Sequence, residues 1–155
     1  MFAENRKGLS FDQLFGPYVR GASKIVVTDP YIRLFYQVRN MMEFVETVLK
    51  VKAPEDQVAI ELITGPDDGT SGKQRENLDA IVAACEGTGI TFSWAIDGTG
   101  TAHARHIVTD TGWKISLDRG LDIFQHYQMN DAFSLTNRIQ EHRAVKQFEV
   151  TYIRS

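Results

Sequence analysis

Residues 24–30, Lys24-Ile25-Val26-Val27-Thr28-Asp29-Pro30, are the starting point for the fold of this chain. The run is short and rich in β-branched residues, and it closes with an Asp-Pro pair, which is typical of a buried strand that ends in a turn. The segment after it, 34–50, repeats apolar residues at intervals of three, four and seven. This spacing predicts an amphipathic helix with one face packed on a sheet.

The alternation of strand and helix continues through the middle of the chain. Residues 58–64 and 91–96 have strand patterns. Between them, residues 73–86 form a second amphipathic pattern, and Gly87 and Gly89 end it. The order strand-helix-strand-helix-strand favours a parallel sheet covered by helices.

The pattern changes in the second half of the chain. Residues 104–109 and 113–117 are strand-like, and Asp110-Thr111-Gly112 between them predicts a tight hairpin turn. Three further segments complete the prediction, namely a loose lead-in over 1–10, a short helix over 11–18 that Gly16-Pro17 interrupts, and a last strand over 148–153. The predicted fold class is α/β, a mixed sheet flanked by helices on its faces, in a single domain of 155 residues.

Composition restricts the class of protein. The chain has 17 Lys and Arg against 20 Asp and Glu, a net charge of −3, which does not favour a dedicated nucleic-acid binder. Cys85 is the single cysteine, so we expect a buried thiol in a reducing compartment. No apolar run approaches the roughly 18 residues of a membrane span, and the first residues do not resemble a signal peptide. We therefore expect a cytoplasmic location, or a peripheral one at a membrane.

His103, Arg105 and Asp110 form the one motif with recognisable chemistry, His-x-Arg-x-x-x-x-Asp. Alternate residues of a strand project to one side, so His103 and Arg105 are expected to point together. The turn that follows is expected to bring Asp110 near that end of the sheet. An imidazole can attack phosphorus or shuttle a proton, and a guanidinium can bind two phosphate oxygens. The motif suggests a phosphodiester site; the alternative is a strand-end histidine, a solvated arginine and a turn aspartate.

Five further residues are candidate ligands of the same site. Asp29, Tyr31 and Arg33 follow the first strand, and ligands in open α/β sheets favour the carboxyl ends of strands. The alternative is that Asp29 caps the next helix while Tyr31 packs. Arg119, held close by Gly120, is a candidate anion ligand, with a surface loop as the alternative, and Lys114 is a further candidate cation.

No cofactor and no metal are expected. His103 and His106 are three residues apart, but no further histidine or carboxylate pair completes a metal shell. The glycines of the loop at Gly98 and Gly100 precede no helix and lack the Gly-Lys-Ser/Thr of a phosphate-binding loop.

Several motifs in a fixed order resemble those of one family. They are Phe15-Gly16-Pro17-Tyr18, Asp29-Pro30-Tyr31-Ile32-Arg33, Gly112-Trp113-Lys114-Ile115 and Arg119-Gly120-Leu121-Asp122-Ile123-Phe124. Together they cover the chain from about Phe11 to the last strand. They resemble the C-terminal domain of proteins that contain a microtubule interacting and trafficking (MIT) domain.

The resemblance implies a phospholipase-D-like fold that usually forms homodimers. It also implies a non-catalytic domain that binds acidic phospholipid membranes, while a separate MIT domain recruits membrane-remodelling filament proteins. Active phospholipase-D-like enzymes use His-x-Lys-x-x-x-x-Asp twice per site, whereas here Arg105 takes the lysine position and the motif occurs once. We expect a standalone relative, such as a bacterial one, or a domain cut from a longer protein.

Three functions from different classes are compatible with these observations. The first is a catalytically degenerate, homodimeric binding module, a pseudoenzyme, for phosphate on acidic lipid headgroups or on a nucleic-acid backbone. The second is a phosphodiesterase or nuclease whose His103-centred site forms across a dimer. The third is a protein-interaction or targeting domain of a larger assembly. The single motif and its arginine favour the first.

Overall fold

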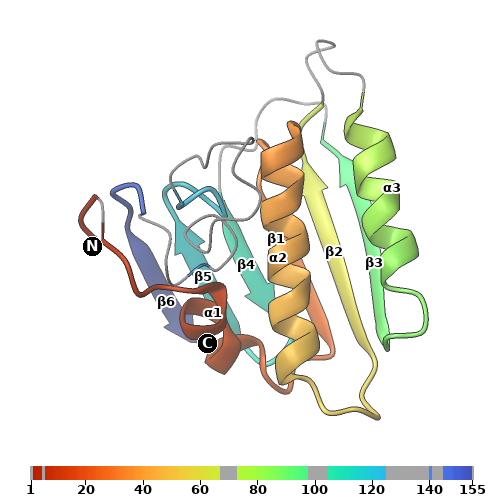
Figure 1. Ribbon diagram of the computed structural model, residues 1–155. Coiled ribbons are helices and arrows are strands. Elements are labelled where there is room, and N and C mark those ends of the chain that lie inside the picture. Colours follow the sequence, from red (N-terminus) through yellow and green to blue (C-terminus); the bar gives the residue numbers. More distant parts are fainter. Residues whose placement is uncertain are drawn as a thin grey trace.

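The computed structural model describes residues 2–4, 6–66, 73–97, 105–124, 140 and 145–154. These residues form a mixed sheet of six strands with three helices packed on it, which confirms the predicted α/β class (Figure 1). The helices are α1 (Phe11–Val19), α2 (Phe35–Val51) and α3 (Gln74–Ala84). The strands are β1 (Lys24–Thr28), β2 (Val58–Thr64), β3 (Ile90–Ile96), β4 (His106–Thr109), β5 (Trp113–Leu117) and β6 (Val150–Arg154).

The strand order is β3-β2-β1-β4-β5-β6, so the first strand of the chain lies in the middle of the sheet. β1, β2 and β3 are parallel, as expected for strands joined by helical crossovers. β4 runs antiparallel to β1, and the predicted hairpin of β4 and β5 is present. Thr28 at the end of β1 pairs with His106 at the start of β4. The segment after β1 and the segment before β4 therefore meet at the same end of these two strands.

The helices cover one face of the sheet. The side chains that point toward them are almost inaccessible to solvent, and they include Ile25, Val27, Ile60, Leu62, Ile107 and Ile115. In α2, Met41 and Phe44 are fully buried against this layer. The sequence predicted helices on the faces of the sheet; in the described part of the chain, all three lie on the same face (Figure 1).

Helix α1 continues through the Gly16-Pro17 pair that was expected to interrupt it. Pro17 stands in the last turn of this short helix, where it costs only one backbone hydrogen bond. The turn is held by packing, because Phe15 is fully buried and its ring lies 5.6 Å from that of Phe44 in α2. The burial of Phe15 in the core therefore outweighs the tendency of Gly16-Pro17 to end the helix.

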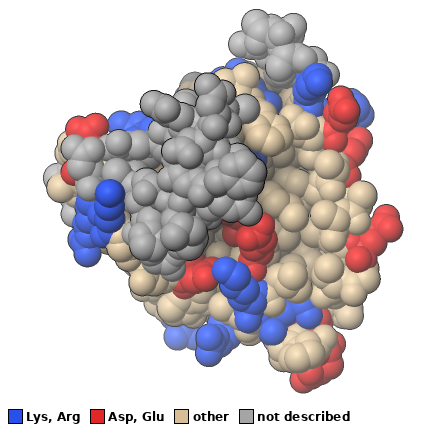
Figure 2. All heavy atoms as spheres, in the orientation of Figure 1, with Lys and Arg blue, Asp and Glu red and all other residues tan. Residues whose placement is uncertain are grey.

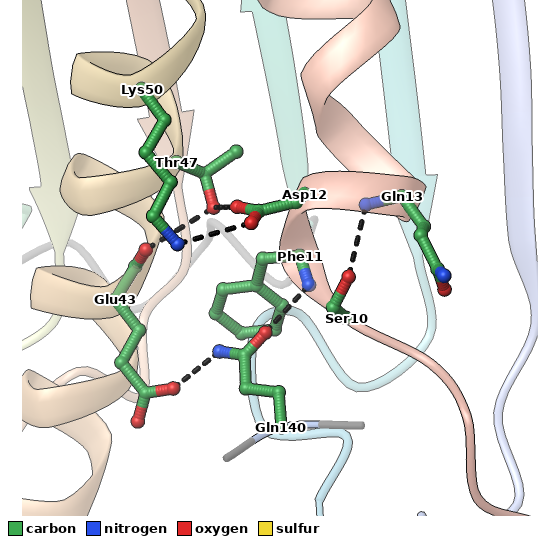
Figure 3. A network of polar contacts seen from close by, with 8 residues as sticks. All are labelled: Ser10, Phe11, Asp12, Gln13, Glu43, Thr47, Lys50 and Gln140. Carbon is green, nitrogen blue, oxygen red and sulfur yellow. Dashed lines mark hydrogen bonds and ion pairs between the residues drawn. The ribbon is translucent and has the colours of Figure 1, made fainter.

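Polar contacts join α1 to α2 beside this core (Figure 3). Asp12 accepts a hydrogen bond of 2.8 Å from the Thr47 hydroxyl and forms an ion pair of 3.1 Å with Lys50. The Gln140 side chain accepts a hydrogen bond of 2.7 Å from the backbone N–H of Phe11, a donor that has no partner within the helix. The two helices are thus fixed to one another by both apolar and polar contacts.

The first residues of the chain are tied to its last part. Phe2 and Phe148 form an antiparallel bridge with backbone hydrogen bonds of 2.8 and 3.1 Å. Leu9 and Ser10 are buried, and the Ser10 hydroxyl caps α1. Phe2, Leu9 and Ser10 of the expected loose lead-in are therefore packed against the domain, whereas the other described residues of this segment are exposed.

Among the described residues, no helix combines the length and the apolar character that crossing a bilayer requires. The buried Cys85 thiol agrees with the prediction for this residue.

Candidate functional site

The candidate site lies where β1 ends and β4 begins. Asp29, Tyr31 and Arg33 follow β1, and Arg105 directly precedes β4. The antiparallel pairing of these two strands brings together segments that are more than 70 residues apart in the sequence. Four of the residues predicted from sequence are therefore assembled by the sheet itself.

Two arginines converge on the ring of Tyr31. The guanidinium carbon of Arg105 lies 4.3 Å from the centre of this ring, and that of Arg33 lies 5.4 Å from it. Both side chains are half-buried. Within the described part of the chain, neither guanidinium has a carboxylate within ion-pairing distance. Two cations thus lie against one aromatic ring, and no described acidic side chain forms an ion pair with either.

Asp29 lies behind the arginines as a buried carboxylate that is only 2% exposed. It accepts hydrogen bonds from the backbone N–H groups of Tyr31, at 3.0 Å, and Leu121. Burial raises the pKa of the Asp29 carboxyl, although these hydrogen bonds and the charge of Arg105 oppose the rise. The carboxylate organises the loop and is not a surface ligand.

Gly120 allows this close approach. Its φ is +59°, and a Cβ placed on it would overlap the Asp29 Oδ2 atom and lie 2.9 Å from Asp29 Cγ and 3.2 Å from Arg105 Cδ. No side chain fits in that space, so the Gly120 backbone packs directly against the Asp29 carboxylate and the aliphatic part of the Arg105 side chain. The sequence had suggested a glycine that holds Arg119 close; instead it makes room for Asp29.

The loop after β1 is fixed by polar contacts from β2 and α3. The Thr64 hydroxyl accepts a 3.2 Å hydrogen bond from the Ile32 backbone N–H. The buried Gln74 side chain donates to the carbonyls of Ile32, at 3.0 Å, and Gly65, at 2.9 Å. These contacts set the path of the backbone that carries Tyr31 and Arg33.

Asp110 does not join this cluster. It lies at the opposite end of the β1–β4 pair, where its carboxylate accepts hydrogen bonds of 3.0 Å from the Ser23 backbone N–H and 2.7 Å from the Ser23 hydroxyl. The expectation that the turn brings Asp110 near Arg105 is wrong, because β4 runs away from Arg105 for its whole length before the turn begins. The bond with Ser23 lowers the pKa of Asp110, which fits a turn-fixing role.

Two other predicted cations lie elsewhere, and one predicted residue is not described. Lys114 is on the sheet face away from the helices, opposite Val108. The Arg119 Nε atom donates a 2.8 Å hydrogen bond to the carbonyl of Gln147. His103 lies outside the described residues. The described core of the site is therefore Asp29, Tyr31, Arg33, Arg105 and Gly120.

Sequence reasoning missed two contributors to the site. Gln74 is one of several polar residues in an amphipathic helix, and nothing in its spacing marks it as buried. Asp122, named in the sequence only as part of a family motif, contributes to the raised pKa of Asp29 through its charge, and its own carboxylate pairs with Lys146 at 2.8 Å. That ion pair partly compensates the negative charge of Asp122 near Asp29.

Replacement of Asp29 by asparagine tests the electrostatics of this loop. Because burial raises the folded pKa above its ordinary 3.8, the folded state of the wild type holds this proton more tightly than the unfolded chain does. Its free energy of unfolding therefore falls as the pH rises from 3.8 to the folded pKa, and it remains lower above that pKa. The asparagine does not titrate and keeps an acceptor for the Tyr31 N–H. Urea denaturation at several pH values should show that the free energy of unfolding of Asp29→Asn, relative to that of wild type, increases with pH. A difference that stays constant with pH would contradict a raised pKa for Asp29.

Charge on the helix side of the molecule is mixed. Lysine and arginine side chains are interspersed with aspartate and glutamate, and an uncharged stretch extends over α2 and α3 (Figure 2). No broad basic surface is visible among the described residues on this face. Anion recognition would accordingly depend on local groups and not on a general positive field.

Comparisons with known proteins add to this geometry. A family model described as the phospholipase D-like domain at the C-terminus of MIT matches residues 8–154. The chain is also similar to MIT domain-containing protein 1 of Mus musculus, with 31% identity over 127 residues. That match covers 81% of this chain and 49% of the relative, so the chain spans about half the length of the curated relative it matches.

Proposed function

Since the chain belongs to the family of phospholipase D-like domains at the C-terminus of MIT, we propose that it is a catalytically degenerate, homodimeric binding module for phosphate-bearing ligands. The observation that carries the proposal is the convergence of Arg33 and Arg105 on Tyr31, at 5.4 and 4.3 Å from its ring centre. A planar guanidinium matches two oxygens of one phosphate, and stacking on an aromatic ring holds its plane in place.

Two features of the surroundings support anion binding at this place. Burial opposes the ionisation of Asp29 by raising its pKa. The negative charge of this carboxyl, which lies near Arg105, therefore competes less with an anionic ligand. The 17-residue helix α2 begins at Phe35, so the positive end of its dipole lies beside Arg33. Both features favour a negative ligand over a positive one.

Binding is favoured over cleavage by the placement of Asp110. A three-residue acid-base site would need its carboxylate near Arg105, whereas it is bonded to Ser23 at the other end of the strand pair. An arginine also remains charged under all ordinary conditions, so Arg105 cannot exchange a proton as a lysine can. These points support a pseudoenzyme. The catalytic alternative predicts turnover of bis(p-nitrophenyl) phosphate that is lost in His103→Ala.

The ligand carries a phosphate group that belongs either to an acidic lipid or to a nucleic-acid backbone. The first would give a cytoplasmic protein at a membrane surface. Because the chain has a net charge of −3 and its helix face is of mixed charge, we expect binding that is local and weakens with salt.

The test measures phosphate binding in matched arginine variants. Wild type, Arg105→Ala and Arg33→Ala are titrated with inorganic phosphate, with a single-stranded oligonucleotide, and with phosphatidylcholine vesicles that contain or lack phosphatidylserine. Each alanine variant should bind roughly 10- to 100-fold more weakly, since charge-assisted hydrogen bonds contribute about 1.5–3 kcal/mol. Arg20→Ala is the control, because Arg20 is exposed at the end of α1 and away from Tyr31.

The three ligands separate the possible sources. Vesicle binding that requires phosphatidylserine identifies a lipid surface, and oligonucleotide binding identifies a phosphodiester backbone. The proposal is overturned if wild type binds none of the three at low salt. It is also overturned if the double variant of Arg33 and Arg105 binds as tightly as wild type.

A further inference from the structure

Strand β3 forms one outer edge of the six-stranded sheet, beside helix α3 (Figure 1). Its seven residues, Ile90–Ile96, include no charged residue, no proline and no glycine. Proteins usually protect an edge strand with a charged residue, a proline or a bulge, because its free backbone groups can pair with another extended chain. The opposite edge strand, β6, carries Arg154, whereas β3 has the composition of a strand with neighbours on both sides.

The backbone of β3 alternates between bonding to β2 and pointing outward. The N–H group of Asp97, directly after β3, donates a 2.7 Å hydrogen bond to the carbonyl of Thr64 in β2. In a parallel pair, every second residue of a strand makes such bonds. The N–H and C=O groups of Phe92, Trp94 and Ile96 therefore point away from β2. Among the described residues, none forms a hydrogen bond with these outward groups.

A cavity opens beside this edge, between β3 and the end of α3. Its volume is about 390 Å³, and its walls include Val82, Cys85 and Glu86 from the end of α3 and the turn after it, and Ile90 and Phe92 from β3. Because Phe92 also has an outward backbone, a residue placed opposite it on an added strand would have its side chain next to the cavity. The space is sufficient for one aliphatic side chain.

Two charged residues lie near the two ends of α3 along the same edge. Arg75 is exposed, and its guanidinium carbon lies 5.4 Å from the centre of the Trp94 ring. The Asp79 carboxylate fixes this ring by accepting a 3.0 Å hydrogen bond from the indole N–H. Glu86 is exposed in the wall of the cavity. In the part of the chain that the structure describes, neither Arg75 nor Glu86 has an ion-pair partner within 4 Å.

We propose that the outer edge of β3 binds an extended segment of another protein, which adds a strand antiparallel to β3. The segment has the pattern acidic-x-aliphatic-x-basic. Residues directly opposite one another in an antiparallel pair have their side chains on the same face. The acidic residue lies opposite Trp94, near Arg75, and the aliphatic residue lies opposite Phe92, beside the cavity. The basic residue lies opposite Ile90, near Glu86.

Backbone pairing supplies the affinity in this arrangement, and the cavity and the two charges supply the specificity. Each of Phe92, Trp94 and Ile96 can exchange two hydrogen bonds with the residue opposite it. Antiparallel pairing is the more stable direction per residue, and a separate chain is free to adopt it. The inference goes beyond the anion site, which lies between β1 and β4, and does not depend on it.

The first test uses a fluorescent peptide that contains Glu-Thr-Leu-Thr-Lys between uncharged, blocked ends. Fluorescence anisotropy should show binding to the wild type with a Kd on the order of 100 μM or lower. N-methylation of the leucine nitrogen should weaken binding at least about tenfold, because this N–H donates to β3. N-methylation of the threonine after the leucine is the matched control. Its N–H points to solvent, so the affinity should change by no more than about twofold.

The second test reverses a charge on each side of the proposed interface. Arg75→Glu should weaken binding of the peptide at least about threefold at low salt, since exposed charge pairs contribute modestly. A peptide with lysine in place of its glutamate should restore it. Arg154→Glu is the matched control, because the Arg154 guanidinium carbon lies at the same 5.4 Å from an aromatic ring, that of Trp113, but on the far edge strand β6. This variant should bind like the wild type.

Each result decides the inference. It is overturned if the wild type does not bind at up to about 1 mM peptide, which is too weak for a specific partner. It is also overturned if the control methylation weakens binding as much as the first, or if Arg75→Glu does not discriminate between the two peptides. The methylated peptides leave the protein unchanged, so misfolding cannot explain their effect. Arg105→Ala should bind the peptide like the wild type, which separates a failure at this edge from a failure of the anion site.

Discussion

Replacement of Gly120 by alanine is expected to lower the free energy of unfolding by about 2–5 kcal/mol. The backbone of this residue is left-handed, with a φ of +59°, which costs an L-residue about 1–2 kcal/mol. The added Cβ would also overlap the carboxylate of Asp29, which is buried and cannot retreat into solvent. Overpacking of this kind typically costs about 1–3 kcal/mol.

Gly21→Ala is the control that separates the two effects. Gly21 has a φ of +81°, and a Cβ placed on it would meet no atom within 4 Å, so its substitution reports backbone strain alone. Urea denaturation should show a loss of only about 1–2 kcal/mol for this variant. An equal decrease in the free energy of unfolding in both variants would mean that Asp29 moves aside freely and that the packing of Gly120 against Asp29 is loose.

Gln74→Leu is expected to destabilise the protein by about 2–5 kcal/mol while nearly preserving the volume of the side chain. The amide nitrogen of Gln74 donates to the buried carbonyls of Ile32 and Gly65, and leucine can donate to neither. A buried polar group without a partner costs about 1–3 kcal/mol, and here two such groups arise together. Thermal or urea denaturation measures the loss.

The same variant reports on the loop that carries Tyr31 and Arg33. If Gln74 fixes the path of this loop, the affinity for inorganic phosphate should fall even under conditions where the variant is fully folded. Gln13→Leu is the control, since the Gln13 side chain is exposed on α1 and its replacement should change stability by no more than about 0.5 kcal/mol. Full stability of Gln74→Leu would show that water or another group satisfies both carbonyls.

Much of the fold was accessible from sequence because its signals are local. β1, β2 and β5 begin and end at the residues that their patterns predicted, and α2 and α3 differ from the prediction by no more than two residues at either end. The family relation was visible in short motifs for the same reason. Gly16-Pro17 is the exception, since the local signal of a helix break was opposed by the burial of Phe15, a contact between distant segments.

The site was only partly predictable because its geometry depends on strand direction. The pairing of β1 with β4 brings Arg105 to Asp29, as the position of both at strand ends had suggested. The same antiparallel direction places Asp110 at the opposite end of the strand pair, away from the cluster. No spacing rule within a single segment reveals the direction in which two strands pair. Gly120 was recognised as a close-approach glycine, but the group that approaches it comes from a segment about 90 residues earlier.

The central place of β1 also matters to the growing chain. During synthesis, β1, β2 and β3 can pair once residue 96 has emerged, but the other backbone edge of β1 has no partner until residues 106–109 follow. An unpaired strand edge is a template for pairing with other chains, so the nascent protein passes through a stage that is prone to aggregation. Pairing with β4 covers this edge of β1, but β4 and then β5 present an unpaired edge in turn until β6 is made, so an exposed edge persists until late in the synthesis of the domain.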